Sequence, residues 1–239
     1  MLPSPASGLA ASSLTALLLP AGLLAAPPAG PSRDARPCFA LQDGVSEPLG
    51  PFLPRRDGDH AEWGTYPDGR AWASTRARVE LPLAIVLAKL RDHRNLKDMS
   101  RTRLVTRPQV RAGYLDAREV DVEVTLRALF VKLRVAWTEE WGYRVLAGSA
   151  TEPEAALAVY QKVAGSSHLA HQCGSYLLTP AGPRATDLTL YEEVKARRRS
   201  AEDTRDMQRG ILRNLREDRW PLPSDALAAP GQPEARRLP

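Results

Sequence analysis

The chain of 239 residues carries 33 basic and 28 acidic residues, a formal net charge of +5, and 43% of its residues are hydrophobic. Such a chain can bury one sizeable core, so a single globular domain is expected. The basic surplus is small and spread along the chain, which argues against nucleic-acid binding. The two cysteines, Cys38 and Cys173, exclude a disulfide-rich scaffold and a four-cysteine zinc site, and they can form one bridge or none.

The first 30 residues resemble a secretory signal peptide. An apolar run extends from Leu9 to Ala26 and ends in small residues. No basic residue precedes the run, and Pro27 follows the expected cleavage point, so a disordered leader is the alternative. Export to the periplasm or the extracellular space is therefore expected, with a cytoplasmic location as the alternative.

The composition divides the rest of the chain into three parts. Residues 31–62 show no sustained period and form an extended N-terminal arm, whose one apolar part is Cys38 to Leu41. Residues 63–220 contain the periodic segments of the folded domain. Residues 221–239 are rich in Pro and Ala and are expected to be a disordered tail.

The domain begins with a predicted strand and two short helices. The strand spans Ala71 to Leu81, and an apolar helix spans Leu83 to Leu90 with Pro82 at its first turn, where proline is favoured. A second short helix is expected from Asn95 to Met99. One or two strands follow within residues 103–114, broken at Pro108, which favours an edge or a turn.

The stretch from Val120 to Tyr143 is the most strongly patterned part of the chain. Apolar residues alternate from Val120 to Leu126 and then change parity, continuing from Val131 to Trp137. A strand with one buried face has this period. Either a bulge or a reversal must therefore lie at Ala128 to Phe130.

Three more elements complete the prediction. The segment from Ala155 to Tyr160 can be a helix or a strand, whereas Ser166 to Leu178 reads as a strand in which Gly174 marks a bulge. Thr186 to Val194 is the last strand.

A long helix is expected from Ser200 to Arg216. Ser200 is the candidate N-cap, and Asp203 lies three positions on, close to a capping box. A narrow apolar stripe runs along this otherwise charged helix and consists of Met207, Ile211, Leu212 and Leu215.

The sequence contains no phosphate-binding glycine loop or nucleophile elbow, so no catalytic residue and no cofactor are predicted. His168 and His171 have the spacing of a metal motif, but on a strand they point to opposite faces, so no metal site is predicted. The acidic residues from Asp116 to Glu123 are expected on a solvated face. Arg197 to Arg199 form a charged turn or contact anionic headgroups in a transient membrane contact.

The order of these elements resembles the helix-grip fold of the START, polyketide-cyclase and birch-pollen-allergen superfamily. The strand, proline, helix and aspartate from Arg76 to Asp92 resemble its opening. Gly174 to Pro180 and Thr186 to Tyr191 resemble its last two strands before the gripping helix. The resemblance covers residues 70–217 and implies an α+β fold in which a curved antiparallel sheet wraps a long C-terminal helix.

The resemblance also implies a tunnel between sheet and helix that holds a lipid, a sterol or a polyketide-like molecule. The expected function is binding or carriage of this ligand by a monomer. One alternative is a polyketide cyclase or aromatase using polar residues in the same cavity, and the other is an interaction protein with a filled core. The residues predicted to bind the ligand are Arg134, Trp137, Trp141, His171, Tyr176, Met207 and Ile211.

Overall fold

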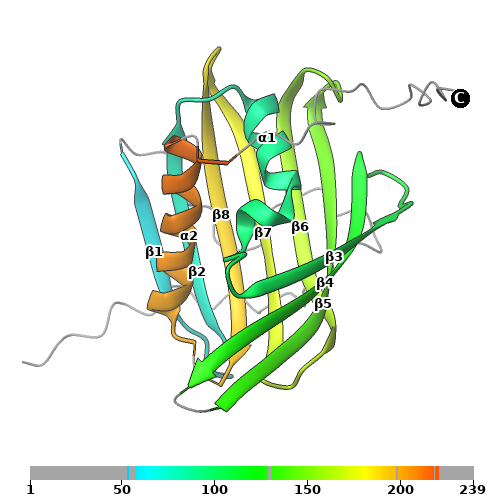
Figure 1. Ribbon diagram of the computed structural model, residues 1–239. Helices are drawn as coiled ribbons and strands as arrows, with labels where there is room; N and C mark the ends of the chain where they lie inside the picture. The colour runs from blue at the N-terminus through cyan, green and yellow to red at the C-terminus, as the bar shows by residue number, and fades with distance from the viewer. Residues whose placement is uncertain (1–52, 54–57, 129–130, 198, 218, 221–239) are drawn as a thin grey trace, which may run out of the picture.

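The computed structural model is one curved antiparallel sheet of eight strands with its helices on the concave face (Figure 1). The structure describes residues 53, 58–128, 131–197, 199–217 and 219–220. The predicted leader, nearly all of the arm and the tail lie outside the described residues.

The elements follow the predicted order, with one additional strand at the start. In chain order they are β1 (His60–Thr65), β2 (Ala71–Val79), α1 (Leu83–Arg91), the 3-10 helix η1 (His93–Leu96), β3 (Thr102–Gln109), β4 (Asp116–Ala128), β5 (Val131–Gly148), β6 (Pro153–Gly165), β7 (Leu169–Gly182), β8 (Ala185–Ala196) and α2 (Ala201–Arg216). The strands lie side by side in the order β1-β2-β8-β7-β6-β5-β4-β3. This is the helix-grip arrangement, so the predicted fold class is confirmed.

The start of the domain confirms the strand, proline and helix pattern. Pro82 is the N-cap residue of α1, and the helix ends where Asp92 leaves the helical conformation. The Asp92 side chain then accepts a hydrogen bond from the Arg94 backbone and so begins η1. This places the second short helix at His93–Leu96, earlier in the chain than predicted.

The predicted break at Ala128 to Phe130 is a reversal. Ala128 at the end of β4 pairs with Val131 at the start of β5 in a continuous antiparallel register. The inward residues therefore have even numbers on β4 and odd numbers on β5, as in the pair Val122 and Trp137. Pro108 lies within β3, which is the edge strand, as the missing N–H requires.

The structure resolves one prediction that the sequence left open and corrects another. The undecided segment from Ala155 to Tyr160 lies in β6, where both faces are buried and the alternation is therefore hidden. The bulge predicted at Gly174 is wrong, because Gly174 pairs in register with Tyr160 and Glu192. Glycine is required there because a Cβ atom would lie 2.6 Å from the Tyr160 ring. The register shifts of β7 against β8 fall instead between Leu169 and His171 and between Pro180 and Gly182.

The long C-terminal helix is held to the sheet by polar and apolar contacts. Ser200 and Asp203 form the predicted capping box at its start. Of the predicted stripe, Ile211, Leu212 and Leu215 are buried in the main core, and Met207 is partly exposed. The buried Gln208 adds a specific anchor on β2, accepting a hydrogen bond from Thr75 Oγ1 at 2.7 Å and donating one to the Ala73 carbonyl at 3.0 Å.

Candidate functional site

An aromatic stack fills the middle of the concave face. The rings of Trp141 on β5 and Tyr160 on β6 lie parallel with centroids 4.2 Å apart, and Tyr176 on β7 meets both edge-on. Each of these side chains is at most 3% exposed. Inward positions on three adjacent strands bring them together, because successive residues of a strand alternate between faces.

A buried carboxylate lies beside this stack. Glu139 is fully buried, with Oε1 accepting hydrogen bonds from Lys97 Nζ at 2.7 Å and Trp137 Nε1 at 2.8 Å. Its Oε2 accepts one from Trp141 Nε1 at 2.8 Å. Burial alone would raise the pKa of Glu139, but the charge and hydrogen bond of Lys97 and the two indole donors outweigh it, so this pKa is lowered.

A second buried group lies on β7 and β8. Gln172 donates from Nε2 to Glu192 Oε1 at 2.8 Å, and Arg199 Nη2 lies 3.2 Å from Glu192 Oε2. The Gln172 Oε1 atom is buried and has no hydrogen-bond partner within the described structure. If the Gln172 amide were flipped, its oxygen would face the Glu192 carboxylate, and two acceptors would lie against each other. The orientation that leaves Gln172 Oε1 unpaired is therefore the chemically consistent one. An unpaired buried acceptor carries a desolvation cost of about 1–3 kcal/mol and is a natural partner for a ligand donor.

His93 is a buried, neutral imidazole at the start of η1, directly after α1. It is 3% exposed, and its Nε2 lies 3.0 Å from the Tyr143 hydroxyl. Burial lowers the pKa of His93 to about 3. Its Nδ1 is a second buried polar atom without a partner within the described structure. At neutral pH this imidazole is a hydrogen-bonding group, because its pKa is too low for a general base.

The sheet separates the predicted ligand residues into two groups. Four of them pack in the core on the concave side: the buried Trp141, Tyr176 and Ile211 and the partly exposed Trp137. Met207 is partly exposed and contacts Arg199, which in turn contacts Glu192 of the buried polar group.

Arg134 and His171 lie apart from these residues. By strand alternation both are on the convex face, where Arg134 is exposed and His171 pairs with Glu193.

Sequence reasoning missed the polar residues of the concave side, namely Glu139, Gln172 and Glu192. Glu139 shares the inward parity of Trp137 and Trp141, and that parity was the available signal.

A cleft of about 370 Å³ opens on the convex side of β3, β4 and β5 and is separate from the aromatic stack. It is lined by Met99, Ser100, Arg101, Thr102, Arg103, Glu123, Thr125 and Arg134. Most of these side chains are polar or charged, so this cleft does not have the apolar lining expected of the tunnel.

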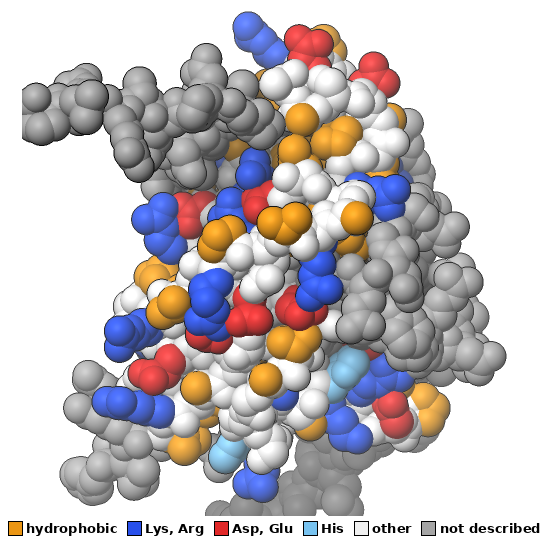
Figure 2. Space-filling model, turned by 90° about the vertical axis from the view of Figure 1, so that its right-hand side faces the viewer, with side chains coloured by type: hydrophobic (Ala, Val, Ile, Leu, Met, Phe, Trp, Pro, Cys, Tyr) orange, Lys and Arg blue, Asp and Glu red, His pale blue; other side chains and the backbone are white. Residues whose placement is uncertain are grey.

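Figure 2 shows one face of the molecule, on which basic, acidic and hydrophobic side chains are interspersed.

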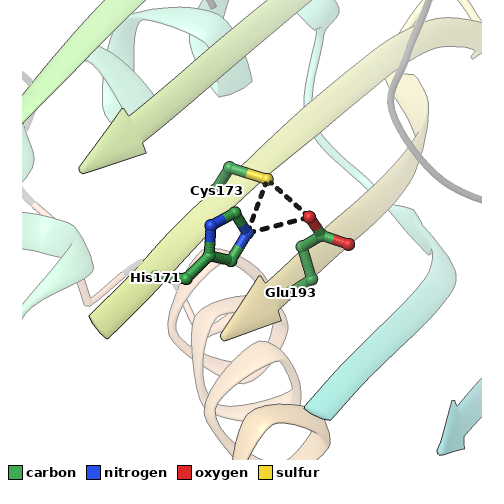
Figure 3. A group of neighbouring side chains, drawn as sticks. All are labelled: His171, Cys173 and Glu193. Carbon is green, nitrogen blue, oxygen red and sulfur yellow. Dashed lines mark hydrogen bonds and ion pairs between the residues drawn. The ribbon is translucent and has the colours of Figure 1, made fainter. Parts of the chain in front are cut away.

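A compact group of potential metal ligands lies on the convex face of β7 and β8 (Figure 3). His171 Nε2 lies 2.9 Å from Glu193 Oε1, and Cys173 Sγ lies 3.7 Å from that nitrogen and 3.3 Å from that oxygen. Cys173 is disulfide-bonded, however, so its sulfur is not a thiolate. The guanidinium of Arg70 also lies 2.7 Å from Glu193 Oε1. In this covalent state the group is therefore an ion-pair network rather than a metal site.

The described helices include none that is both long and apolar enough to cross a membrane.

No protein-family model and no curated protein sequence matches the chain. Among solved structures, it is similar to the lipid transfer and protein localization domain of human StarD13 (DLC2), with a TM-score of 0.50 and 14% identity over 69% of this chain and 87% of that one. It is also similar to a STAR-related lipid transfer protein from Xanthomonas axonopodis, with a TM-score of 0.46 and 12% identity over 70% and 96% of the two chains. The chain is also similar to the Zhui aromatase/cyclase from Streptomyces sp. R1128, with a TM-score of 0.38 and 13% identity over 61% of this chain and 86% of that one.

These neighbours include START-domain proteins and polyketide aromatase/cyclases, and they share the helix-grip fold with this chain. At such low identity the likeness concerns the fold alone.

Proposed function

We propose that the protein binds a hydrophobic small molecule that carries a hydroxyl group, and that it holds this ligand between the sheet and α2. The observation that carries the proposal is the buried acceptor Gln172 Oε1, which has no partner within the described structure and lies on the concave side. A hydroxyl donor would satisfy this atom. The nearby aromatic rings of Trp137 and Tyr160 would cover the apolar body of the ligand.

The path to this site is proposed to run between Trp137 and Met207. Both are partly exposed, whereas the side chains deeper in the core are buried. Since Arg199 contacts both Met207 and Glu192, a ligand displacing Met207 would reach the network that contains Gln172.

The arrangement supports binding over cyclase chemistry. A general acid or base needs a carboxyl or imidazole group that can exchange a proton near neutral pH. Glu139 is paired with Lys97, Glu192 is paired with Arg199, and the pKa of His93 is about 3. Glu139, whose pKa is lowered, and His93 are therefore each held in one protonation state near neutral pH, and the Glu192 carboxylate is engaged by Arg199.

The test is a titration with dehydroergosterol, a fluorescent sterol with one hydroxyl, and with a fluorescent diacylglycerol. Saturable binding of at least one probe is expected at one site per chain. Gln172→Leu should weaken that binding about fivefold, since one hydrogen bond contributes roughly 1 kcal/mol and tenfold corresponds to about 1.4 kcal/mol.

The matched control is Gln161→Leu, because Gln161 lies on β6 with the opposite parity to the inward Tyr160. This variant should bind as the wild type does. Absence of saturable binding by both probes would favour the filled-core interaction protein instead.

We also propose that the protein is exported and that it meets a membrane only transiently, as the apolar leader and the basic turn at Arg197 suggest. Cell fractionation with an N-terminal sequence determination tests this: mature protein beginning after the leader is expected, and an uncleaved cytoplasmic product would contradict export.

A further inference from the structure

Part of the convex face, on β6 and β7, is buried although the helices lie on the other side of the sheet. Leu157, Val159 and Leu177 form an apolar cluster there, flanked by Tyr114 and Leu146. Cys173 and Ser175 on β7 are also at most 1% exposed. Since α1 and α2 pack on the concave side, some other segment must cover these convex residues.

Leu53, the one described residue before position 58, lies beside this face. Its side chain is 1% exposed, and its carbonyl accepts a hydrogen bond from Arg76 Nη1 at 3.1 Å. Arg76 also pairs with Asp187 on β8 at 2.9 Å, and both residues have convex-face parity. Leu53 therefore lies against the convex face at this point.

Cys173 provides an independent observation on the same face. It is disulfide-bonded, and the only other cysteine of the chain is Cys38. On β8, Cys173 pairs with Glu193. Asp187, which pairs with Arg76 near Leu53, lies six positions earlier on the same strand, so the two points are roughly 20 Å apart. The 14 residues between Cys38 and Leu53 give 15 steps from one Cα atom to the next, which can span up to about 50 Å, so the distance is easily bridged.

We propose that Cys38 is the disulfide partner of Cys173 and that residues 38–53 form an N-terminal strap across the convex face of β8, β7 and β6. The strap is tied by the disulfide at one end and by Leu53 at the other. Its apolar residues Phe39 and Leu41 follow Cys38 directly and match the apolar cluster of the face.

The disulfide forms by exchange with an oxidised dithiol carrier. Two thiols lose two electrons and two protons, and the carrier is reduced to its dithiol. Such a bond persists in an oxidising compartment, which agrees with the proposed export. The strap itself does not depend on the proposed ligand.

Peptide mapping of the full chain without reductant tests the pairing. The expected result is one linked peptide containing Cys38 and Cys173, in a species of monomer mass. Two free thiols would overturn the proposal, and so would a dimer cross-linked through cysteines, which would make a second copy the occupant of the face.

A stability measurement tests the strap itself. Cys38→Ser should lower the melting temperature by about 5–15 °C, because the cross-link closes a long loop. It should also increase amide hydrogen exchange in the covering segment and at the edges of the apolar cluster. Reductant should lower the wild type to the same temperature and leave Cys38→Ser unchanged. Equal melting of wild type and Cys38→Ser would overturn the strap.

Discussion

The buried pair of Glu139 and Lys97 makes the sharpest energetic prediction. Both carboxylate oxygens of Glu139 accept hydrogen bonds, from the ammonium of Lys97 and from two indole groups. In Glu139→Gln one of these oxygens becomes an NH2 group, which then faces a donor and cannot accept its hydrogen bond. Lys97, with a side chain only 15% exposed, also loses its counterion. Breaking a buried pair from one side costs about 3–5 kcal/mol, so this loss of unfolding free energy is expected.

A double-mutant cycle separates the pair from its surroundings. Lys97→Met alone leaves a buried carboxylate with two indole donors and should also cost about 3–5 kcal/mol. The double variant leaves only one mismatched indole contact and should cost about 1–3 kcal/mol. The expected coupling energy is therefore at least about 3 kcal/mol.

Urea unfolding at pH 7, followed by circular dichroism, provides these free energies. Arg101→Gln is the control, because it removes an exposed pair with Asp98 at 3.7 Å and should leave stability unchanged within error. Single variants that each cost less than 1 kcal/mol, with no coupling between them, would refute the description of Glu139 as a buried charge.

Three further predictions concern other parts of the domain. The pKa of His93 is about 3 in the folded state, against about 6.5 for an unperturbed histidine in the unfolded chain, so the stability linked to its neutral form is complete above pH 6.5 and is lost as pH falls. The free energy of unfolding should therefore decrease by about 2 kcal/mol between pH 7 and 5. His93→Gln should flatten this pH dependence in urea unfolding, and an unchanged pH dependence would contradict the assignment. Gly174→Ala should cost about 2 kcal/mol or more by overlap with Tyr160, while Gly210→Ala, with open space at its Cβ position, should be neutral or stabilising; calorimetric melting that ranks them in reverse would show that the sheet register is wrong. Leu212→Asp should prevent folding by burying an unpaired charge, and unaltered thermal melting would show that α2 does not pack as described.

Alternation in the sequence was sufficient to locate strands with one buried face. β4 and β5 are such strands, and the change of parity between them marked the reversal. β6 was ambiguous because Leu157 and Val159 are buried on the convex face while Ala156 and Ala158 are buried on the concave face. Burial on both faces removes the polar half of the pattern.

The first strand was missed because it is short and mostly half-exposed. β1 lies at the edge of the sheet and pairs with β2 alone, so its sequence carries little apolar signal. Its existence depends on pairing with β2 through a tight turn at Tyr66 to Arg70, where Gly69 adopts a positive φ of 83°.

The polar part of the site could be predicted only in part. Glu192 and Glu193 are adjacent in the sequence, yet one faces the concave interior and the other the convex network. Only the register of β7 against β8 decides which is which. The register shift between Leu169 and His171 likewise decides the surroundings of His171, and nothing in the local sequence indicates it.

The central claim is that a hydrophobic ligand binds between the sheet and α2. Native mass spectrometry of the purified full chain, followed by organic extraction and mass analysis of the extract, tests it most directly. We expect one bound molecule per chain, recovered in the extract as a hydroxyl-bearing apolar compound and reduced in Gln172→Leu. Repeated recovery of ligand-free protein from lipid-rich extracts would contradict the claim.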